Sequence, residues 1–188
     1  MTKIIKTPTF VTNRLVLRPL ILEDSGLLEK YFNNWNIIKH LNDRVPWPYP
    51  EGAAYDFYKN DALPRVERGD AFFWTITENS TPIGLIELRR EALHHTDGHR
   101  GFWLGEPFWN QGYMTEAASA VNDFAFFDLK YDKMILENHK DNIASHRIKE
   151  KTGSTLLKTV QKQNRGESIE VEVWELTAEN WRQFRQQR

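Results

Sequence analysis

The chain has 188 residues, no cysteine and a formal net charge of -1, from 25 lysines and arginines against 26 aspartates and glutamates. The length fits one domain with a substantial core, the lack of cysteine excludes disulfides, thiolate metal sites and a cysteine nucleophile, and the balanced charge argues against nucleic acid as a partner. Since no apolar run is long enough for a membrane helix and the N-terminus does not resemble a signal peptide, we expect a cytoplasmic protein with neither a membrane nor a nucleic acid as its partner.

The first half of the chain alternates apolar segments with turn-forming ones. Its periodicity predicts a strand, two helices and two strands, over residues 13–20, 24–33, 51–63, 71–77 and 83–89. The first strand ends at Pro19, and Asp24 or Ser25 is the expected N-cap of the first helix. Between the helices lies a segment that is too rich in proline for a helix or a central strand, Pro46-Trp47-Pro48-Tyr49-Pro50.

The second half is predicted to open with a loop over residues 94–98. A strand, a helix, a strand, a helix and a two-stranded hairpin follow, over residues 101–104, 115–129, 133–137, 142–152, 155–162 and 168–176. The longer helix has an apolar face of closely spaced alanines, valine and phenylalanine. Its opposite, polar face is predicted to consist of Glu116, Ser119, Asn122 and Asp123.

Local signals mark the ends of the later helices. Asn142 is the expected N-cap of the second of these helices, and Gly153 its C-terminal stop. Residues 181–188 carry three arginines and no acid, which we interpret as a solvated terminal helix rather than a nucleic-acid patch. Strands interleaved with helices imply one α/β (or α+β) domain over residues 1–188, with a mixed sheet covered on at least one face.

The segment from Gly101 to Ala117 runs from a strand through a turn-rich loop into a helix. The first backbone N–H groups of a helix lack partners and carry positive potential, so they attract anions. Gly112 just before the helix would let a phosphate approach closely. The chain has neither a P-loop nor a G-x-G-x-x-G motif. By spacing alone, an ordinary connection is the favoured interpretation of this segment, ahead of a phosphate site.

This segment closely resembles the coenzyme-A loop of GNAT N-acetyltransferases, and in particular the RimJ/RimL-like branch that acetylates protein N-termini. The motifs that carry the resemblance run in order over residues 12–181. They are Thr12-Asn13-Arg14-Leu15-Val16-Leu17-Arg18-Pro19, Gly101-Phe102-Trp103-Leu104, Asn110-Gln111-Gly112-Tyr113-Met114-Thr115-Glu116-Ala117, Asn142-Ile143-Ala144-Ser145 with Glu150-Lys151-Thr152-Gly153, and Trp174-Glu175-Leu176-Thr177-Ala178-Glu179-Asn180-Trp181. The resemblance implies a mostly antiparallel central sheet, flanked by helices and splayed in the middle where the cofactor arm enters.

The resemblance also implies acetyl-CoA as the co-substrate and no metal. It assigns to cofactor binding Phe102, Trp103, Leu104, Asn110, Gln111, Gly112, Tyr113, Met114, Thr115, Asn142 and Ser145. Backbone groups of the first three would bind pantetheine, the N–H groups of residues 110–115 would hold the pyrophosphate, and the last two would lie along the thiol end. The chain departs from the family pattern at Met114, where a small residue is usual, at His99, where an acid is frequent, and at Lys149, where many members carry tyrosine.

Without cysteine, the acetyl group must pass directly from the thioester to the amine in a ternary complex. By the resemblance, a backbone N–H near Leu104 polarises the carbonyl. Ser145 then supplies a proton or hydrogen bond to the thiolate, although a serine in a first helical turn also commonly bonds the backbone. The base is expected to be Glu87, with Glu106 and His99 in reserve; a solvated strand glutamate is the competing interpretation.

In the family, the region of Trp47 and Tyr49 borders the acceptor site, which Glu87 would also face. The competing interpretation of these aromatic residues is a hydrophobic lid on the core. The spacing of His94, His95 and His99 is more typical of an exposed loop than of a metal site, because no carboxylate lies in register.

We therefore expect an acetyl-CoA-dependent N-acetyltransferase that acts directly on a primary amine, as a monomer or homodimer. The first expectation for the acceptor is a protein or peptide N-terminal α-amine. An α-amine has a pKa of about 8 against about 10.4 for lysine, so it needs only a weak base. The alternatives are a small amine (an amino acid, polyamine or aminoglycoside) and a catalytically silent acetyl-CoA-binding module.

Overall fold

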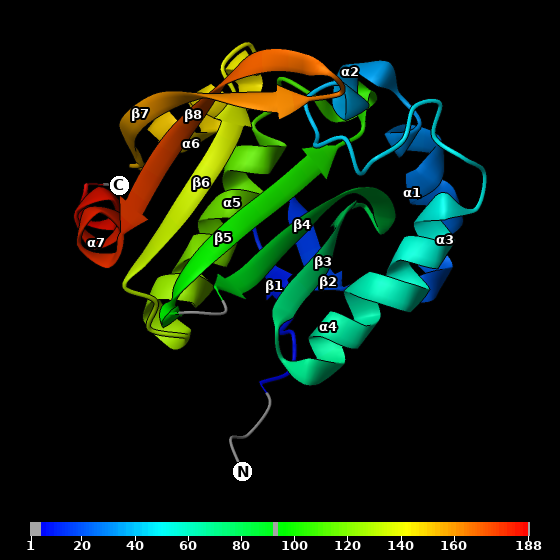
Figure 1. Ribbon diagram of the computed structural model, residues 1–188. Coiled ribbons are helices and arrows are strands. Elements are labelled where there is room, and N and C mark those ends of the chain that lie inside the picture. The colour runs from blue at the N-terminus through cyan, green and yellow to red at the C-terminus, as the bar shows by residue number, and fades with distance from the viewer. Residues whose placement is uncertain (1–4, 92–93, 188) are drawn as a thin grey trace.

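Figure 1 shows the computed structural model, which describes residues 5–91 and 94–187, with side chains described for 5–90 and 98–187. Eight strands form one sheet in the order β1-β2-β3-β4-β5-β6-β8-β7. The strands are β1 (Phe10–Val11), β2 (Leu15–Pro19), β3 (Ala71–Glu78), β4 (Thr81–Glu91), β5 (His94–Leu104), β6 (Lys133–His139), β7 (Thr155–Asn164) and β8 (Glu167–Thr177). Every pairing among the described strands is antiparallel except that of β5 with β6.

Helices flank this sheet, as the sequence predicts. The α-helices are α1 (Ser25–Phe32), α2 (Trp35–Ile38), α3 (Ala53–Phe57), α4 (Leu63–Arg68), α5 (Tyr113–Asp123), α6 (Ile143–Lys151) and α7 (Ala178–Gln186). Short 3-10 segments are η1 (Leu22–Asp24) and η3 (Glu106–Phe108), and π-helical segments are η2 (Tyr58–Ala62) and η4 (Phe124–Asp128). Over the described ranges, no helix combines the length and apolar character that crossing a membrane requires.

The sheet opens between β5 and β6. These strands pair in parallel only at Asp97 with Lys133 and at Gly98 with Met134, and beyond this fork the two ribbons diverge (Figure 1). Where backbone pairing stops, the imidazole Nδ1 of His99 lies 2.9 Å from the carbonyl oxygen of residue 135. The splayed, mostly antiparallel sheet predicted from the sequence is therefore confirmed.

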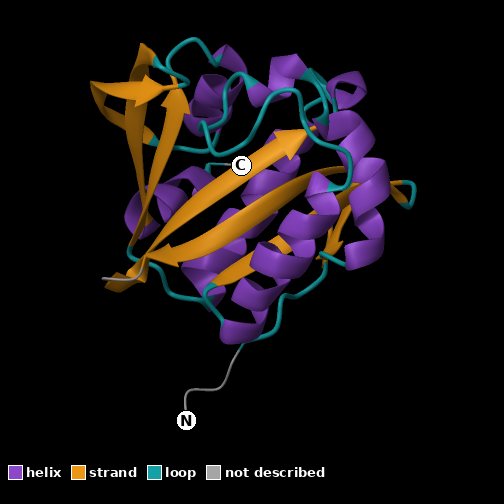
Figure 2. Ribbon diagram, turned by 45° about the vertical axis from the view of Figure 1, so that its right-hand side comes forward, coloured by secondary structure: helices purple, strands orange, loops and turns teal. Residues whose placement is uncertain are grey.

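Successive side chains of the central strands point to opposite faces of the sheet. Trp74 and Ile86 join the core cluster that includes α5. Their neighbours Phe73 and Leu85 join a second cluster, which includes α1 and η2. Figure 2 shows the helices on both sides of the strands. Because both faces are covered, β3 is buried from residue 71 to residue 77 and lacks the clean alternation of a half-exposed strand.

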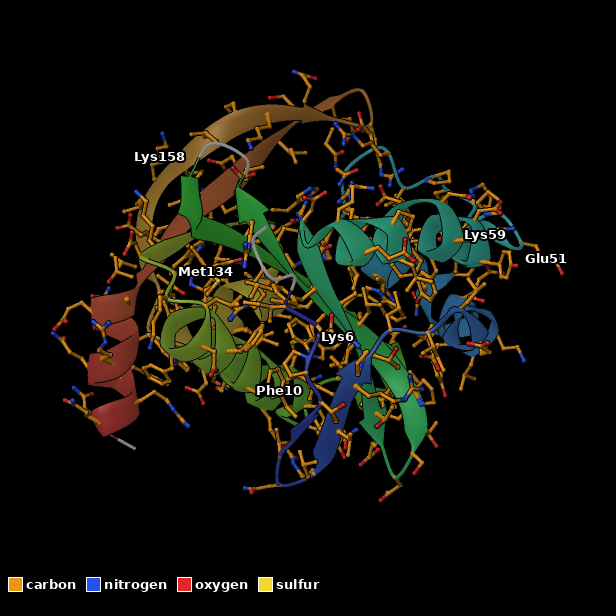
Figure 3. The ribbon with its side chains drawn as sticks, turned by 90° about the horizontal axis from the view of Figure 1, so that it is seen from below. Lys6, Phe10, Glu51, Lys59, Met134 and Lys158 are labelled. Carbon is orange, nitrogen blue, oxygen red and sulfur yellow. The ribbon has the colours of Figure 1, made fainter. Side chains whose placement is uncertain are left out.

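Helix α5 and the segment η4 that continues it bury the apolar face that the periodicity predicts, made of Ala117, Ala118, Val121, Phe124 and Ala125. In Figure 3, Phe10 and Met134 lie on the same side of the sheet as α5; Met134 belongs to the core cluster and Phe10 packs against it. The prediction for Asn122 is wrong, since this residue is fully buried and its Oδ1 accepts a hydrogen bond from the Arg100 guanidinium. A buried arginine needs such an acceptor, and helical periodicity does not reveal that need.

Two further predictions are corrected by the structure. Residues 94–98 are not a loop but the first part of β5, where Gly98 pairs with Arg90 of β4. The residues there are weak strand formers, and the long antiparallel partner overrides that preference. The C-terminal segment is not solvated throughout, because Trp181 on α7 is fully buried and its Nε1 donates a hydrogen bond to Asp123 at 3.0 Å.

Candidate active site

The loop before α5 ends in a left-handed turn. Asn110 has a φ of 61° and Gly112 a φ of 80°, and Gly112 is the N-cap of the helix. Among the described residues, none accepts a hydrogen bond from the backbone N–H groups of residues 110–115. These groups are the orphan donors of a helix start, to which the helix dipole adds positive potential. The loop therefore has the donors that an anionic group requires.

Arg14 and Thr12, from the beginning of the chain, hold this loop in place. Glu116 in the first turn of α5 accepts hydrogen bonds from the Thr12 hydroxyl at 2.6 Å and from Arg14 Nε at 2.8 Å. Arg14 Nη1 also donates to the carbonyl oxygen of Gln111 at 2.7 Å, and its guanidinium lies 4.5 Å from the centre of the Tyr113 ring. Burial alone would raise the pKa of Glu116, but these hydrogen bonds outweigh it and the pKa is lowered.

We expect Arg14→Ala to raise the Kd for acetyl-CoA about tenfold, the equivalent of losing one charge-assisted hydrogen bond. The loop loses its link to the first strands, so its N–H groups are less well preorganised for a phosphate. Isothermal titration calorimetry with acetyl-CoA measures the change. Arg182→Ala on α7, which removes an exposed arginine paired only with Glu179 at 3.8 Å, is the control. Equal affinities of Arg14→Ala and the native chain would contradict the expectation.

A shallow groove of about 420 Å³ runs beside the start of α5. It is lined by Gly112, Thr115, Glu116, Ser119 and Lys151. Lys151 comes from α6 and brings a positive charge to the side of the loop. Lys151 lies in the Glu150-Lys151-Thr152-Gly153 motif but is not among the site residues predicted from the sequence.

A larger cavity of about 850 Å³ lies between the diverging strands and the helices in front of them. Its walls come from β4, β5, β6 and α6 on one side and from α1, α3 and η2 on the other. The residues predicted from the sequence that line it are Tyr49, Glu87, His99, Phe102, Trp103, Asn142 and Ser145. Leu104, Glu106, Trp47 and residues 110–115 lie outside this lining. The structure therefore gathers one group at the cavity and a second at the loop before α5.

Glu87 lies on β4 opposite Gly101 of β5. Its carboxylate lies directly against the glycine, since a Cβ atom at position 101 would be 2.6 Å from Glu87 Oε1. Oε1 also lies 3.1 Å from Nε of Arg89. Burial raises the pKa of Glu87, while Arg89 and then Arg65 act in the opposite direction. A carboxylate with raised proton affinity at a cavity is suited to accept a proton.

His99 lies at the fork and also lines the cavity. Its Nδ1 must carry the hydrogen, because the carbonyl oxygen of Ile135 only accepts, and this leaves Nε2 as an acceptor. Burial, and after it the charge of Arg89, lowers the pKa of His99 to about 4, so the ring is neutral at pH 7. The side chains of His94 and His95, the other members of the predicted histidine spacing, lie outside the described residues.

Helix α6 presents the other side of the cavity. Asn142 caps it as predicted, with Oδ1 accepting from the backbone N–H of Ser145 at 3.1 Å. Ser145 is buried, and its Oγ accepts a hydrogen bond from Nζ of Lys149 at 2.8 Å. Within the described structure, the hydroxyl of Ser145 makes no other hydrogen bond. The alternative interpretation of Ser145, in which its hydroxyl bonds the helix backbone, is therefore not what the structure shows.

Two buried cations at this cavity are missing from the predicted site residues. Arg100 is 3% exposed and Lys149 is 2% exposed. Burial lowers the pKa of Arg100 to about 10; burial, then the charge of Arg100, lowers that of Lys149 to about 7. A sequence signal exists for each: Arg100 precedes Phe102 by two positions and so shares its face of the strand, and Lys149 follows Ser145 by one helical turn.

The proline-rich segment confirms the prediction that it forms neither helix nor strand. Tyr49 lines the cavity and its ring centre lies 4.9 Å from that of Phe32. Burial, and then the charge of Glu29, raises the pKa of Tyr49 to about 12. Trp47 is 42% exposed and lies against Trp35.

One group of potential metal ligands lies near the cavity. The ligand atoms of His40, His139 and Asp141 are within 4.8 Å of one another. Burial lowers the pKa of both imidazoles, and Lys39 and Arg165 act in the same direction against the opposite influence of Asp141. Since these cations would also repel a metal ion, the group is not a strong metal site.

Comparison with known proteins gives a family model and relatives. Residues 14–155 match the model described as Acetyltransferase (GNAT) domain. The Uncharacterized N-acetyltransferase YnaD of Bacillus subtilis (strain 168) is 26% identical over 143 residues, which cover 76% of this chain and 79% of that protein.

Solved structures share the fold. The RimL ribosomal L7/L12 alpha-N-protein acetyltransferase in complex with coenzyme A superposes with a TM-score of 0.75 at 19% identity, covering 91% of this chain and 97% of that chain. A spermidine N-acetyltransferase SpeG chimera from Vibrio cholerae and hSSAT superposes with a TM-score of 0.75 at 14% identity, covering 90% and 98%. At these identities the likeness establishes a common fold and leaves the acceptor open.

Proposed function

We propose that this protein, which belongs to the GNAT acetyltransferase domain family because the family model spans most of the chain, acetylates an α-amine. The proposed acceptor is the N-terminal α-amine of a protein or peptide. As a member of the family, it is an acetyl-CoA-dependent N-acetyltransferase. The order of the motifs over residues 12–181 supports a place for it in the RimJ/RimL-like branch.

The residues at the two sites fit acetyl-CoA. The unpartnered N–H groups of residues 110–115, with Lys151 beside them, suit a pyrophosphate. Beyond the fork, residues 102–104 of β5 have no β6 partner, so their backbone groups on that side are available to the amides of pantetheine. Ser145 and Asn142 lie on the far wall of the same cavity. When bound, acetyl-CoA supplies an activated acetyl group as a thioester.

The charge arrangement of the cavity carries the proposal for the acceptor. Four of the five carboxylates in its lining already have partners, and the fifth, Asp43, is exposed. Asp61 pairs with Arg65 at 3.0 Å, Glu87 with Arg89 at 3.1 Å, Glu137 with Lys162 at 2.6 Å, and Glu29 accepts from the backbone N–H groups of Gly52 and Ala54 at 2.9 Å. Two buried cations, Arg100 and Lys149, face the same space. A polyamine would find few free carboxylates there and would be repelled by both cations. A single amine on an otherwise uncharged peptide end avoids that repulsion.

An α-amine acceptor also needs the weakest general base to remove its proton. An α-amine with a pKa of about 8 is partly neutral at pH 7, whereas a lysine side chain with a pKa of about 10.4 is not. Glu87 then accepts the one proton that the amine releases when its nitrogen binds the acetyl carbon. A backbone N–H near Leu104 polarises the carbonyl.

The test is an acetylation panel with purified protein, acetyl-CoA and a thiol-release readout. We expect kcat/KM for peptides with a free N-terminus to exceed that for free amino acids, spermidine or an aminoglycoside about tenfold or more, because the acceptors differ in contacts made at the transition state. The same peptides with an acetylated N-terminus are the matched control and should give no turnover. Faster turnover of spermidine or an aminoglycoside would overturn the proposed acceptor. Tight acetyl-CoA binding with no turnover of any amine would indicate a silent binding module.

A further inference from the structure

Lys149 is a buried ammonium group without a carboxylate partner. It is 2% exposed, and no carboxylate of the described chain lies within ion-pair distance of its Nζ. Its one hydrogen bond is to Ser145 Oγ at 2.8 Å. Burying an unpaired cation is costly, so a chain that keeps one beside a reaction cavity retains it at the expense of stability.

The charged groups that face Lys149 come from two strands. Arg100 and His99 lie on β5, and Glu172 lies on β8. Glu172 is already engaged by three donors: Asn138 Nδ2 at 2.9 Å, His146 Nδ1 at 2.9 Å and Trp174 Nε1 at 3.2 Å. Arg100 has two buried guanidinium nitrogens, Nε and Nη2, without a partner among the described residues. The surroundings of Lys149 therefore favour the loss of its proton over the formation of an ion pair.

The hydrogen bond between Lys149 and Ser145 also has a direction. An ammonium group only donates, so Ser145 Oγ is the acceptor in this contact. The serine's own hydrogen makes no bond to any other described residue and is therefore available to a group in the cavity. The pair is thus oriented to pass a proton from Nζ through Oγ to a ligand atom.

We propose that Lys149 supplies the proton for the leaving thiolate of coenzyme A, acting through the hydroxyl of Ser145. The inference rests on the proposed function, since it needs an acetyl thioester in this cavity. In the reaction, a bond forms between the acceptor nitrogen and the acetyl carbon, and the carbon–sulfur bond breaks with its electron pair on sulfur. Ser145 gives its hydroxyl hydrogen to that sulfur and takes one from Lys149, which is left neutral. Glu87 takes the proton that the amine releases, and solvent restores both groups.

The pKa of Lys149, which burial and Arg100 lower to about 7, matches this task. A group whose pKa lies near the working pH is present as the acid and still gives up its proton readily. An ordinary exposed lysine, with a pKa of about 10.4, holds its proton too strongly for this role.

The experiment titrates the thiol of bound coenzyme A, read from the ultraviolet absorbance of its thiolate, with desulfo-coenzyme A as the blank. A cysteine-like thiol has a pKa of about 8.5. On the native protein we expect the thiol pKa to be about one unit lower, because the thiolate would accept a hydrogen bond from Ser145 and its negative charge would in turn keep Lys149 protonated. In Lys149→Met and in Ser145→Ala this lowering should largely disappear. Lys158→Met, at an exposed lysine on β7, is the matched control and should behave as the native protein.

Turnover adds a second readout. The kcat of the native enzyme should fall as the pH rises through the pKa of Lys149, and this alkaline limb should be absent from Lys149→Met. Ser145→Ala should slow turnover while leaving the Kd for acetyl-CoA near the native value. Lys149→Met removes a buried unpaired charge, so we expect it to fold and to melt at or above the native temperature; Ser145→Ala tests the same relay independently of that variant.

The outcomes separate the two hypotheses. A thiol pKa that is the same in the native protein, Lys149→Met and Ser145→Ala, all of which bind coenzyme A, would overturn the role of Lys149 and leave the acetyltransferase assignment intact. Failure of the native protein to bind coenzyme A would instead overturn the proposed function.

Discussion

Glu87→Gln is expected to lower kcat/KM for the amine acceptor about 10²-fold to 10⁴-fold, the range that general base catalysis typically contributes. Glutamine keeps nearly the same shape against Gly101, where the carboxylate oxygen lies 2.6 Å from the place of a Cβ, but it cannot accept the proton of the amine. The measurement is a pH profile of kcat/KM between pH 5 and 9, with the preferred peptide acceptor.

The direction in which activity changes with pH tests whether Glu87 is the base. Burial raises the pKa of Glu87, so the native enzyme should lose activity as the pH falls through that raised value and the carboxylate becomes protonated. In Glu87→Gln this acid limb should be missing, and the Kd for acetyl-CoA should not change. Glu167→Gln, at an exposed position on β8, is the control. A profile of Glu87→Gln that keeps the limb would assign the base to another group.

Trp181→Ala is expected to lower the free energy of unfolding by about 3 to 5 kcal/mol, the cost of truncating a large buried aromatic side chain. Trp181 is fully buried, stacks on Phe184 with ring centres 5.3 Å apart, and donates to Asp123 of α5 at 3.0 Å. Its loss would leave a cavity beneath the terminal helix and would remove the donor to one oxygen of Asp123, whose other oxygen still pairs with Arg185 at 3.0 Å. Since that helix packs on the same core as α5, the cooperative transition of the whole domain should shift.

Urea denaturation followed by circular dichroism measures this change as a lower midpoint at constant m-value. Trp35→Ala is the matched control, because Trp35 is 42% exposed, and its midpoint should change much less. Similar midpoints for Trp181→Ala and the native protein would show that α7 adds little to the domain.

Much of the fold is predictable from local pattern because most elements here follow a simple period. The five apolar residues of α5 and η4 that share a helical face are all buried. The predicted Asn142 cap and Gly153 stop are both observed, the latter with a φ of 77°. The early part of β5 is not predictable in this way. Its residues are weak strand formers, and they are held in the sheet by pairing with β4. At Gly98 the Tyr131 ring also lies so close that it leaves no room for a Cβ atom.

The candidate site is predictable to a different degree in its two parts. The loop before α5 carries a contiguous motif, so its residues can be named from the sequence. The links from Thr12 and Arg14 to Glu116 join residues about a hundred positions apart, and only the fold shows them. The same holds for Arg100 and Lys149, whose burial depends on how β5, α5 and α6 meet.

The fork between β5 and β6 has a consequence for the lifetime of the protein. Two residue pairs in parallel are the backbone link across the middle of the sheet, so an extended, amide-bearing ligand seated there would act as a temporary strand between its two halves. Such a ligand stabilises the folded state by about 2.7 kcal/mol when its free concentration is a hundred times its Kd. The melting temperature should therefore rise with the concentration of acetyl-CoA. Resistance to proteolysis in the cell would then follow the supply of the acetyl donor.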